Sequence, residues 1–356
     1  METAENLYYN LLRTFREDSM NKSEFYEFFK KIPKAELHIH IEAVMSRETI
    51  KKLYLKKNGK EFSDSEIKKL FSYSDLNGFI AAFLAVQDLF TSVSDFDLIF
   101  EDLKNYLIRN GVVHCEAFFA PSAFVKKGFD YGEMTKNFEK NLRKIKDETG
   151  ITVWLLGDVS RTFGLENAEN NYKLFKAHPF EGFIGIGLGG AESKGPSKEF
   201  GPVFKKALAD KYHAVAHAGE DVGPESIWDA LKICNAERIG HGITSVQDSE
   251  LVKFLAENKI PVEVAPTSNV FTKKYVKKME EHPVRQMFDE GIAVTIATDD
   301  PIFFGVELID EYWNLYSKLK FSKSDLKQII FNSFDDSFLS DEQKKEFKEK
   351  VEKNWK

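Results

Sequence analysis

Four short motifs, far apart along the chain, hold the residue types that bind a divalent metal ion. His38 and His40 stand two positions apart in AELHIHIE, and on a β-strand this spacing turns both imidazoles to the same side. His217 lies in HAGE, His241 in GHG and Asp299 in TDDP. Three imidazoles and one carboxylate would hold a zinc ion and leave a coordination position for water. The sequence therefore predicts a metal site of catalytic type.

Each motif ends a short apolar run of the kind that forms a β-strand. Eight such runs, each followed by a helical or polar stretch, cover residues 35–42, 112–121, 151–160, 183–190, 212–219, 237–243, 261–269 and 293–300. Buried strands that alternate with helices form a parallel sheet, and eight repeats fit a closed (β/α)8 TIM barrel. A doubly wound open sheet is the alternative. Because barrel enzymes place their chemistry at the carboxyl ends of the strands, the motifs would share one site.

Two regions lie outside this repeat. The aromatic stretch over residues 6–31 predicts a helical N-terminal extension, residues 1–31, which would cap the bottom or the flank of the barrel. Residues 45–110 predict a helical insertion after the first strand, and such an insertion would overhang the catalytic face.

Within the insertion, four apolar residues fall at helical spacing: Phe79, Phe83, Val86 and Phe90. We expect this stripe to pack in the core, with a wall over the substrate as the alternative. No repeat, low-complexity tract or linker divides the chain, so residues 1–356 are expected to form a single domain.

Composition narrows the classes of partner. The chain is 42% hydrophobic and 30% charged, as in folded globular proteins, and its net charge of −7 argues against nucleic acid as a partner. Its two cysteines, Cys115 and Cys234, imply no disulfide framework, and we expect core thiols in a reducing compartment. The sequence shows no signal peptide or membrane-spanning run. We therefore expect a cytoplasmic protein with a small-molecule substrate, without a membrane or an obligate protein partner.

The motifs together resemble a known family. PKAELHIHIEA, HAGEDVGPESIWDAL, ERIGHG, PTSNV and TDDP, found in this order between Pro33 and Tyr312, are similar to motifs of the adenosine/adenine deaminases of the metal-dependent amidohydrolase superfamily. The resemblance implies one Zn²⁺ or similar divalent ion per chain, no organic cofactor, and hydrolytic removal of the amino group of a 6-aminopurine. The strand that ends in GIGLGG lacks the carbamylated lysine of two-metal relatives, which favours one metal.

The resemblance also implies a role for each site residue. The residues that look like metal ligands are His38, His40, His217 and Asp299. The other residues given a role by the resemblance are Glu220 as proton shuttle, His241 as the residue that orients the attacking hydroxide, and Asp300 with the backbone of Gly190 as contacts of the purine ring. Glu220 would have to begin protonated in order to protonate ring N1, and a desolvated site near other acids favours this state.

Several of these residues also allow a purely structural interpretation. Glu220 could be a solvated loop acid, and His241 could make a structural hydrogen bond only. Asp300, expected to be the more exposed of the two consecutive acids, could cap the helix that begins at Pro301.

Other polar residues lie close to the motifs. We expect Glu116 and Glu263, inside strands, to pair structurally. Ser268 and Asn269 could support either the end of the seventh strand or the metal ligands.

The substrate is less defined than the reaction. Adenosine deaminases usually carry aspartate where this chain has Glu42; that aspartate reaches the ribose, and glutamate is more often met in adenine deaminases. GIGL, without the aspartate of the nucleoside enzymes, points the same way. In contrast, ERIGHG and APTSNV look more like the nucleoside branch, and Phe118 replaces a common arginine.

On family frequency, the predicted lead reaction is the conversion of adenosine or deoxyadenosine to the inosine product plus ammonia. The alternatives are adenine to hypoxanthine, another 6-aminopurine, or an amidohydrolase reaction on a cyclic amide or pterin-like heterocycle. A catalytically inactive purine-binding relative is the remote alternative.

Overall fold

Eight parallel strands form one sheet in the order β1 to β8. The structure, a computed structural model, describes residues 20–73 and 76–355. The strands are β1 (Lys34–His40), β2 (Val112–Phe119), β3 (Thr152–Asp158), β4 (Phe183–Leu188), β5 (His213–Ala218), β6 (Arg238–His241), β7 (Val262–Val264) and β8 (Val294–Ile296). Each strand pairs with the next in parallel register, as expected for strands joined by helical crossovers.

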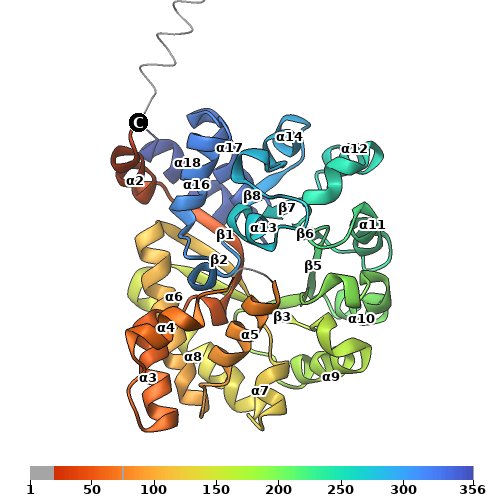
Figure 1. Ribbon diagram of the computed structural model, residues 1–356. Helices are drawn as coiled ribbons and strands as arrows, with labels where there is room; N and C mark the ends of the chain where they lie inside the picture. The colour runs from red at the N-terminus through yellow and green to blue at the C-terminus, as the bar shows by residue number, and fades with distance from the viewer. Residues whose placement is uncertain (1–19, 74–75, 356) are drawn as a thin grey trace, which may run out of the picture.

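The sheet closes on itself just beyond β8. Ile39 and Asp299 form a parallel bridge, in which the His40 N–H donates to Asp299 O at 2.9 Å and the Asp299 N–H donates to His38 O at 3.1 Å. Helices surround the strands, so the predicted (β/α)8 barrel is confirmed and the open-sheet alternative is wrong (Figure 1). The closing bridge joins two of the sequence motifs directly.

The last two strands are shorter than the sequence predicts. The expected seventh strand, 261–269, ends at Val264, and helix α13 (Pro266–Thr272) begins at once. Proline favours this start because the first turn of a helix does not need its missing N–H. Ser268 and Asn269 therefore lie on a helix at the carboxyl end of β7.

Helices pack around the barrel, some between successive strands and others after β8. The longer ones are α6 (Phe96–Asn110), α8 (Tyr131–Thr149), α9 (Gly164–Ala177), α10 (Gly201–Ala209), α11 (Pro224–Lys232), α12 (Ser249–Glu257), α16 (Leu308–Lys318), α17 (Lys323–Asp335) and α18 (Asp341–Asn354). The shorter ones are α7 (Ser122–Lys126), α14 (Val284–Asp289) and α15 (Pro301–Phe304). Their buried faces and the strands share a large hydrophobic cluster, which includes Cys115 and Cys234 as free, buried thiols.

The described part of the N-terminal extension is helix α2 (Lys22–Lys31), and residues 1–19 lie outside the described residues. Phe25 and Phe29 are buried, and the Phe29 ring contacts Tyr312 of α16. Buried Lys34 donates hydrogen bonds to the carbonyl oxygens of Phe29 and Ile32, at the end of the helix. The helix thus covers the flank of the barrel beside α16 (Figure 1).

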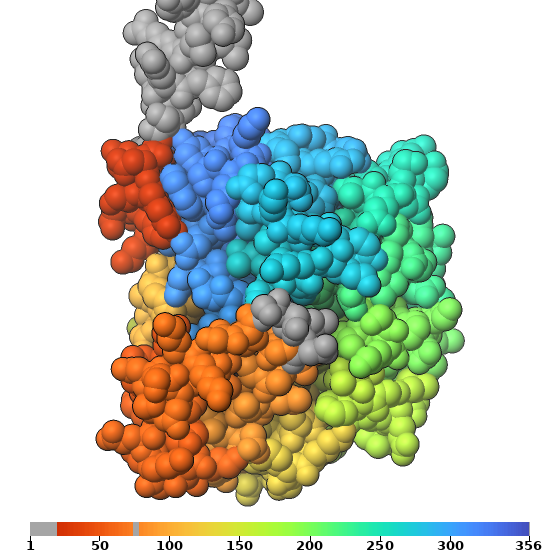
Figure 2. Space-filling view, in the orientation of Figure 1, coloured from red at the N-terminus to blue at the C-terminus, as the bar shows by residue number. Residues whose placement is uncertain are grey.

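The expected insertion, residues 45–110, is shorter in the structure. Its added part consists of α3 (Arg47–Asn58), α4 (Asp64–Leu70) and α5 (Leu76–Gln87), whereas α6 is the barrel helix that leads into β2. On α5, Phe79 contacts the rings of Phe271 and Phe304, which belong to α13 and α15. Figure 2 shows the insertion, in orange, meeting the cyan and blue segments that follow β7 and β8.

The apolar stripe of the insertion has two parts. Val86 and Phe90 are buried, as the core interpretation predicts, whereas Phe79 and Phe83 are only partly buried. Phe79 and Phe83 pack on segments at the carboxyl ends of β7 and β8, so this part overhangs the catalytic face. Among the described residues, no helix is long and apolar enough to cross a membrane.

Candidate metal centre and active site

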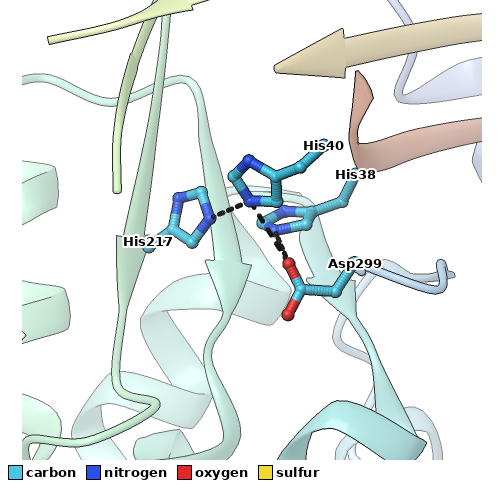
Figure 3. A group of neighbouring side chains, drawn as sticks. All are labelled: His38, His40, His217 and Asp299. Atoms are coloured by element: carbon cyan, nitrogen blue, oxygen red, sulfur yellow. Dashed lines mark hydrogen bonds and ion pairs between the residues drawn. The ribbon is translucent and has the colours of Figure 1, made fainter. Parts of the chain in front are cut away.

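Three imidazoles and one carboxylate from the two ends and the middle of the sequence converge at the carboxyl ends of the strands (Figure 3). His38 and His40 end β1, His217 lies on β5, and Asp299 follows β8. Nε2 of His40 lies 3.3 Å from Nε2 of His217 and 3.3 Å from Oδ1 of Asp299. Nε2 of His38 lies 3.4 Å from the same Asp299 oxygen. The four predicted ligands thus form one cluster.

These separations fit a cation bound between the four side chains. Donor atoms at about 2.0 to 2.1 Å from a zinc ion, spread tetrahedrally, lie about 3.3 Å from each other. Nε2 of His38 is buried and makes no hydrogen bond within the described chain, so its lone pair faces the cluster. The residues present therefore suit a divalent metal ion.

A buried carboxylate orients the first of these ligands. Nδ1 of His38 donates a hydrogen bond to Oε2 of Glu263 at 2.8 Å, which leaves Nε2 as the metal-facing nitrogen. Oε1 of Glu263 accepts from Arg238 at 2.6 Å, and Arg238 also pairs with Glu116 at 2.6 Å. The two glutamates thus pair structurally as predicted, each with Arg238, and Glu263 in addition supports the metal cluster.

The fourth ligand is held from the helix after β7. The hydroxyl of Ser268 donates to Oδ2 of Asp299 at 2.7 Å, which leaves Oδ1 toward the imidazoles. Asp299 and His241 both adopt left-handed backbone conformations, with φ of 62° and 64°. Such conformations cost on the order of 1–3 kcal/mol for a residue other than glycine and are found mainly at functional sites.

The charges of the cluster depend on each other. Burial lowers the pKa of His38 and His40, but the carboxylates around them more than offset it and raise the two values to about 9 and about 10. Burial raises the pKa of Asp299, yet the adjacent imidazoles hold it well below its usual range. The carboxylates thus attract positive charge into the cluster, which a divalent cation would supply.

Glu220 lies beside His241 at the rim of this cluster. Its Oε2 is 3.4 Å from Nε2 of His241, and 21% of its side chain remains exposed. Burial, with the negative charges of Asp299 and Glu192, raises its pKa well above the usual range. The raised pKa favours the protonated form that a proton donor needs, and the largely buried side chain does not fit the alternative of a solvated loop acid.

The loop that carries Glu220 is held by a carboxylate that sequence analysis missed. Glu192 is buried and accepts hydrogen bonds from four consecutive backbone N–H groups, those of Gly219, Glu220, Asp221 and Val222, at 2.6 to 3.1 Å. No local signal in ESKG marks this role, because the partners lie about 28 positions away and meet Glu192 only through the fold.

Two further buried residues join the loops around His217. Arg161 donates to the carbonyl oxygens of Gly195, Leu188 and His217. Asp158 accepts from the N–H groups of Ser160 and Gly189 through Oδ1. Both were missed because their partners are backbone groups of other strand ends.

The structure disagrees with the alternative in which Asp300 is an exposed helix cap. Only 6% of it is exposed, and its side chain makes no capping hydrogen bond to α15. Its Oδ1 is buried without a hydrogen-bond partner in the described chain, and burial with the charge of Asp299 raises its pKa well above normal. An unpartnered buried carboxyl group of this kind is available to a ligand.

Glu42 is also buried beside the cluster, in the turn Ile41–Ala43 that follows β1. Its Oε1 accepts from the Ala120 N–H at 2.9 Å, while Oε2 has no partner in the described chain. Burial raises its pKa to about 7.

Phe118 packs its apolar ring against two of the imidazoles of the cluster. Its ring lies 4.9 Å from the ring of His38 and 5.1 Å from that of His217. A Cβ at Gly187 would come within 2.7 Å of the Phe118 ring, so a larger side chain at this position would displace Phe118.

Gly190 has a φ of 100°, which favours glycine. A Cβ there would meet Thr162, whereas a Cβ at Gly189 would come within 3.5 Å of the His217 ring.

Comparison with known proteins agrees with this site. An adenosine deaminase family model matches residues 33–354. The aminodeoxyfutalosine deaminase of Streptomyces avermitilis is 35% identical, with coverage of 90% of this chain and 91% of that protein. The adenine deaminase of Crocosphaera subtropica is 33% identical, over 89% and 97% of the two chains.

Among solved structures, an adenine deaminase from Arthrobacter aurescens superimposes with a TM-score of 0.86 at 28% identity, covering 90% of this chain and 98% of that one. The chain belongs to the adenosine/adenine deaminase family, the hydrolytic 6-aminopurine deaminases of the amidohydrolase superfamily.

Proposed function

We propose that this protein is a metal-dependent hydrolase that deaminates a 6-aminopurine, with free adenine as its lead substrate. The observation that carries the proposal is the convergence of four metal-type donors at one end of the barrel, with the carboxyl group of Glu220 beside them and its pKa raised. We assign one divalent ion to the cluster, with zinc preferred because imidazole nitrogen and carboxylate oxygen are its usual donors. The ligands are His38, His40, His217 and Asp299.

When bound, such an ion lowers the pKa of a water molecule toward 7. The side chains around the ion would then transfer the protons of the reaction. Glu220 gives its proton to ring N1, which makes C6 electrophilic. The oxygen of a water molecule then bonds to C6, and the proton that this water loses passes to the Glu220 carboxylate. Glu220 passes that proton to the amino nitrogen, the C6–N6 bond breaks with its electron pair on nitrogen, and ammonia leaves as the remaining O–H proton returns to Glu220 and C6 becomes a carbonyl carbon. His241 lies beside the attacking oxygen and orients it. Asp299 contributes to catalysis as a ligand of the ion.

The ring contacts proposed for this reaction are Asp300 and the backbone of Gly190. Burial and the charge of Asp299 raise the pKa of Asp300, which favours the protonated form that can donate a hydrogen bond to a ring nitrogen and so satisfy its unpartnered oxygen. Neither contact requires a ribose.

Two features favour adenine over adenosine, the lead that family frequency suggests. Glu42 is longer than aspartate and lies buried beside the cluster, tied to Ala120, in the region expected to receive a ribose. In addition, adenine deaminases are prominent among the relatives that cover nearly the full chain. The similarity to aminodeoxyfutalosine deaminase makes aminodeoxyfutalosine the second candidate substrate.

The test is ammonia release by the zinc-loaded full chain, measured with adenine, adenosine, deoxyadenosine and aminodeoxyfutalosine. We expect adenine to give the highest kcat/KM, with hypoxanthine as product. A higher kcat/KM on one of the other three would overturn adenine as lead and keep the reaction type. Absence of ammonia from every 6-aminopurine, with the metal shown to be bound, would overturn the reaction itself.

A further inference from the structure

A row of three buried side chains leads from the backbone of α14 to His241. The N–H of Val284 donates to Nδ1 of His282 at 3.1 Å. Nε2 of His282 lies 3.2 Å from Oδ1 of Asn269, and Nδ2 of Asn269 lies 3.0 Å from Nδ1 of His241. All three side chains are buried, so water does not compete for these hydrogen bonds.

The direction of every hydrogen bond in this row follows from its first member. A backbone N–H can only donate, so Nδ1 of His282 must be the unprotonated nitrogen. A neutral imidazole then carries its proton on Nε2 and donates it to Asn269, which must turn its oxygen toward His282. Burial, which lowers the pKa of His282 to about 3, keeps this ring neutral.

The same logic extends to His241. Because the Asn269 oxygen faces His282, the amide NH₂ faces His241 and donates to its Nδ1. Nδ1 is therefore an acceptor, and the proton of the neutral His241 ring lies on Nε2. This nitrogen is the one that faces Glu220, at 3.4 Å, and the metal cluster.

We propose that Asn269 and His282 are positioning residues that fix His241 with its proton on Nε2, so that His241 serves as a hydrogen-bond donor to the attacking oxygen and not as its base. The donor role rests on the proposed function, whereas the tautomer itself does not. This tautomer of His241 leaves proton transfer to Glu220 alone, since the protonated Nε2 of His241 has no free lone pair. The backbone N–H of Val284 on α14 thus determines, through His282 and Asn269, which nitrogen of His241 carries the proton.

The direct test is the tautomer of His241 in the full-length, zinc-loaded protein labelled with ¹⁵N-histidine. Long-range ¹H–¹⁵N correlation spectra distinguish a protonated from a bare ring nitrogen, and the spectrum of His241→Asn identifies the His241 signals by their loss. We expect a bare Nδ1 and a protonated Nε2. A protonated Nδ1 would overturn the proposal. The only variant that must fold for this measurement is His241→Asn, which serves to assign the signals.

Asn269→Asp reverses the polarity of the row. A carboxylate accepts from both neighbours, so His241 must place a proton on Nδ1, and we expect its Nδ1 signal to shift accordingly. We expect kcat to fall about 10²- to 10³-fold, as for the loss of one oxyanion donor, with little change in KM. An unchanged His241 tautomer in this variant would contradict the relay.

Ser268→Ala is the matched control for the spectrum, because Ser268 lies on the same helix and contacts Asp299 but not the row. Its His241 tautomer should equal that of the parent, and the half-buried His213, which lies at the other end of β5 from His217, should keep its signals in every variant.

A pair of changes at His282 separates the hydrogen bonds from the bulk of the ring. Glutamine can accept from Val284 and donate to Asn269, so His282→Gln should keep the His241 tautomer. His282→Phe can do neither and should give a mixture, with a lower kcat than His282→Gln. Equal tautomers in the two variants would overturn the role of His282. An inactive parent with the expected tautomer would count against the proposed function only.

Discussion

Glu263 accepts the Nδ1–H of His38 at 2.8 Å, in the fully buried interior of the barrel. The contact selects which nitrogen of His38 faces the cation cluster and strengthens it as a donor. Arg238 compensates the buried negative charge of Glu263, and Glu116 balances Arg238 in turn. The metal cluster therefore rests on an ion-pair network inside the barrel.

Glu263→Gln should weaken metal binding about 10- to 100-fold, since the amide can no longer polarise His38. Competition with a chromogenic chelator measures the change. Glu116→Gln is the matched control, because it also removes a carboxylate from Arg238 but does not touch His38. Equal losses in both variants would show that the effect comes from the ion pair with Arg238.

Glu220→Gln should retain the metal and lose about 10²- to 10⁴-fold in kcat, because an amide cannot deliver the proton to ring N1. Metal content by elemental analysis and ammonia release by the same sample check both parts. Full activity in the variant would exclude the proposed proton path.

Glu192→Gln should loosen the loop that carries Glu220. An amide has one acceptor oxygen and cannot hold the four N–H groups of residues 219–222 that the carboxylate accepts. We expect at least about tenfold lower kcat with the metal retained, since displacement of a catalytic group is costly. In Glu192→Gln, the backbone N–H groups of residues 219–222 should also exchange their hydrogens faster. Glu199→Gln serves as the control, because Glu199 is exposed.

Glu42→Asp tests the choice between base and nucleoside. The shorter side chain frees space beside Ala120, so the ratio of kcat/KM for adenosine to that for adenine should rise. The two substrates are compared on one preparation of each protein. A ratio that stays constant would remove Glu42 from the argument about the substrate.

Glu311 should make the stability of the protein depend on pH. It is fully buried on α16, and burial raises its pKa to about 7. Since the folded pKa lies above the unfolded value near 4.5, the folded state binds the extra proton between these values. The stabilisation is fully present below pH 4.5 and is lost as the pH rises through 7.

Glu311→Gln stays neutral throughout this range. The unfolding free energy of the parent minus that of Glu311→Gln should therefore fall by about 3 kcal/mol from pH 4.5 to above pH 7. Urea unfolding of both proteins across this range measures it. A constant difference would show that Glu311 does not titrate in the folded protein.

Much of the architecture could be predicted from the sequence. Eight apolar runs matched the eight strands because buried parallel strands carry a strong hydrophobic signal. The metal-type residues could be grouped because the carboxyl ends of barrel strands meet at one face. The ends of strands were less predictable: Pro266 stops β7 and begins α13, a local effect that the apolar pattern hides.

The environments of single side chains could not be predicted. The sequence left open that Asp300 is an exposed helix cap, yet Asp300 is buried and its side chain makes no capping hydrogen bond. Glu192 and Arg161 gain their partners from segments distant in sequence, so no local pattern marks them. Such residues become visible only when tertiary packing is known.

The bridge between Ile39 and Asp299 has a consequence for biosynthesis. His38 and His40 are translated about 260 residues before Asp299. A nascent chain therefore displays its first two imidazoles long before the carboxylate that completes the set. The bridge that joins the first and last strands also brings Asp299 to the imidazoles, so the four donors cannot be assembled before the barrel closes.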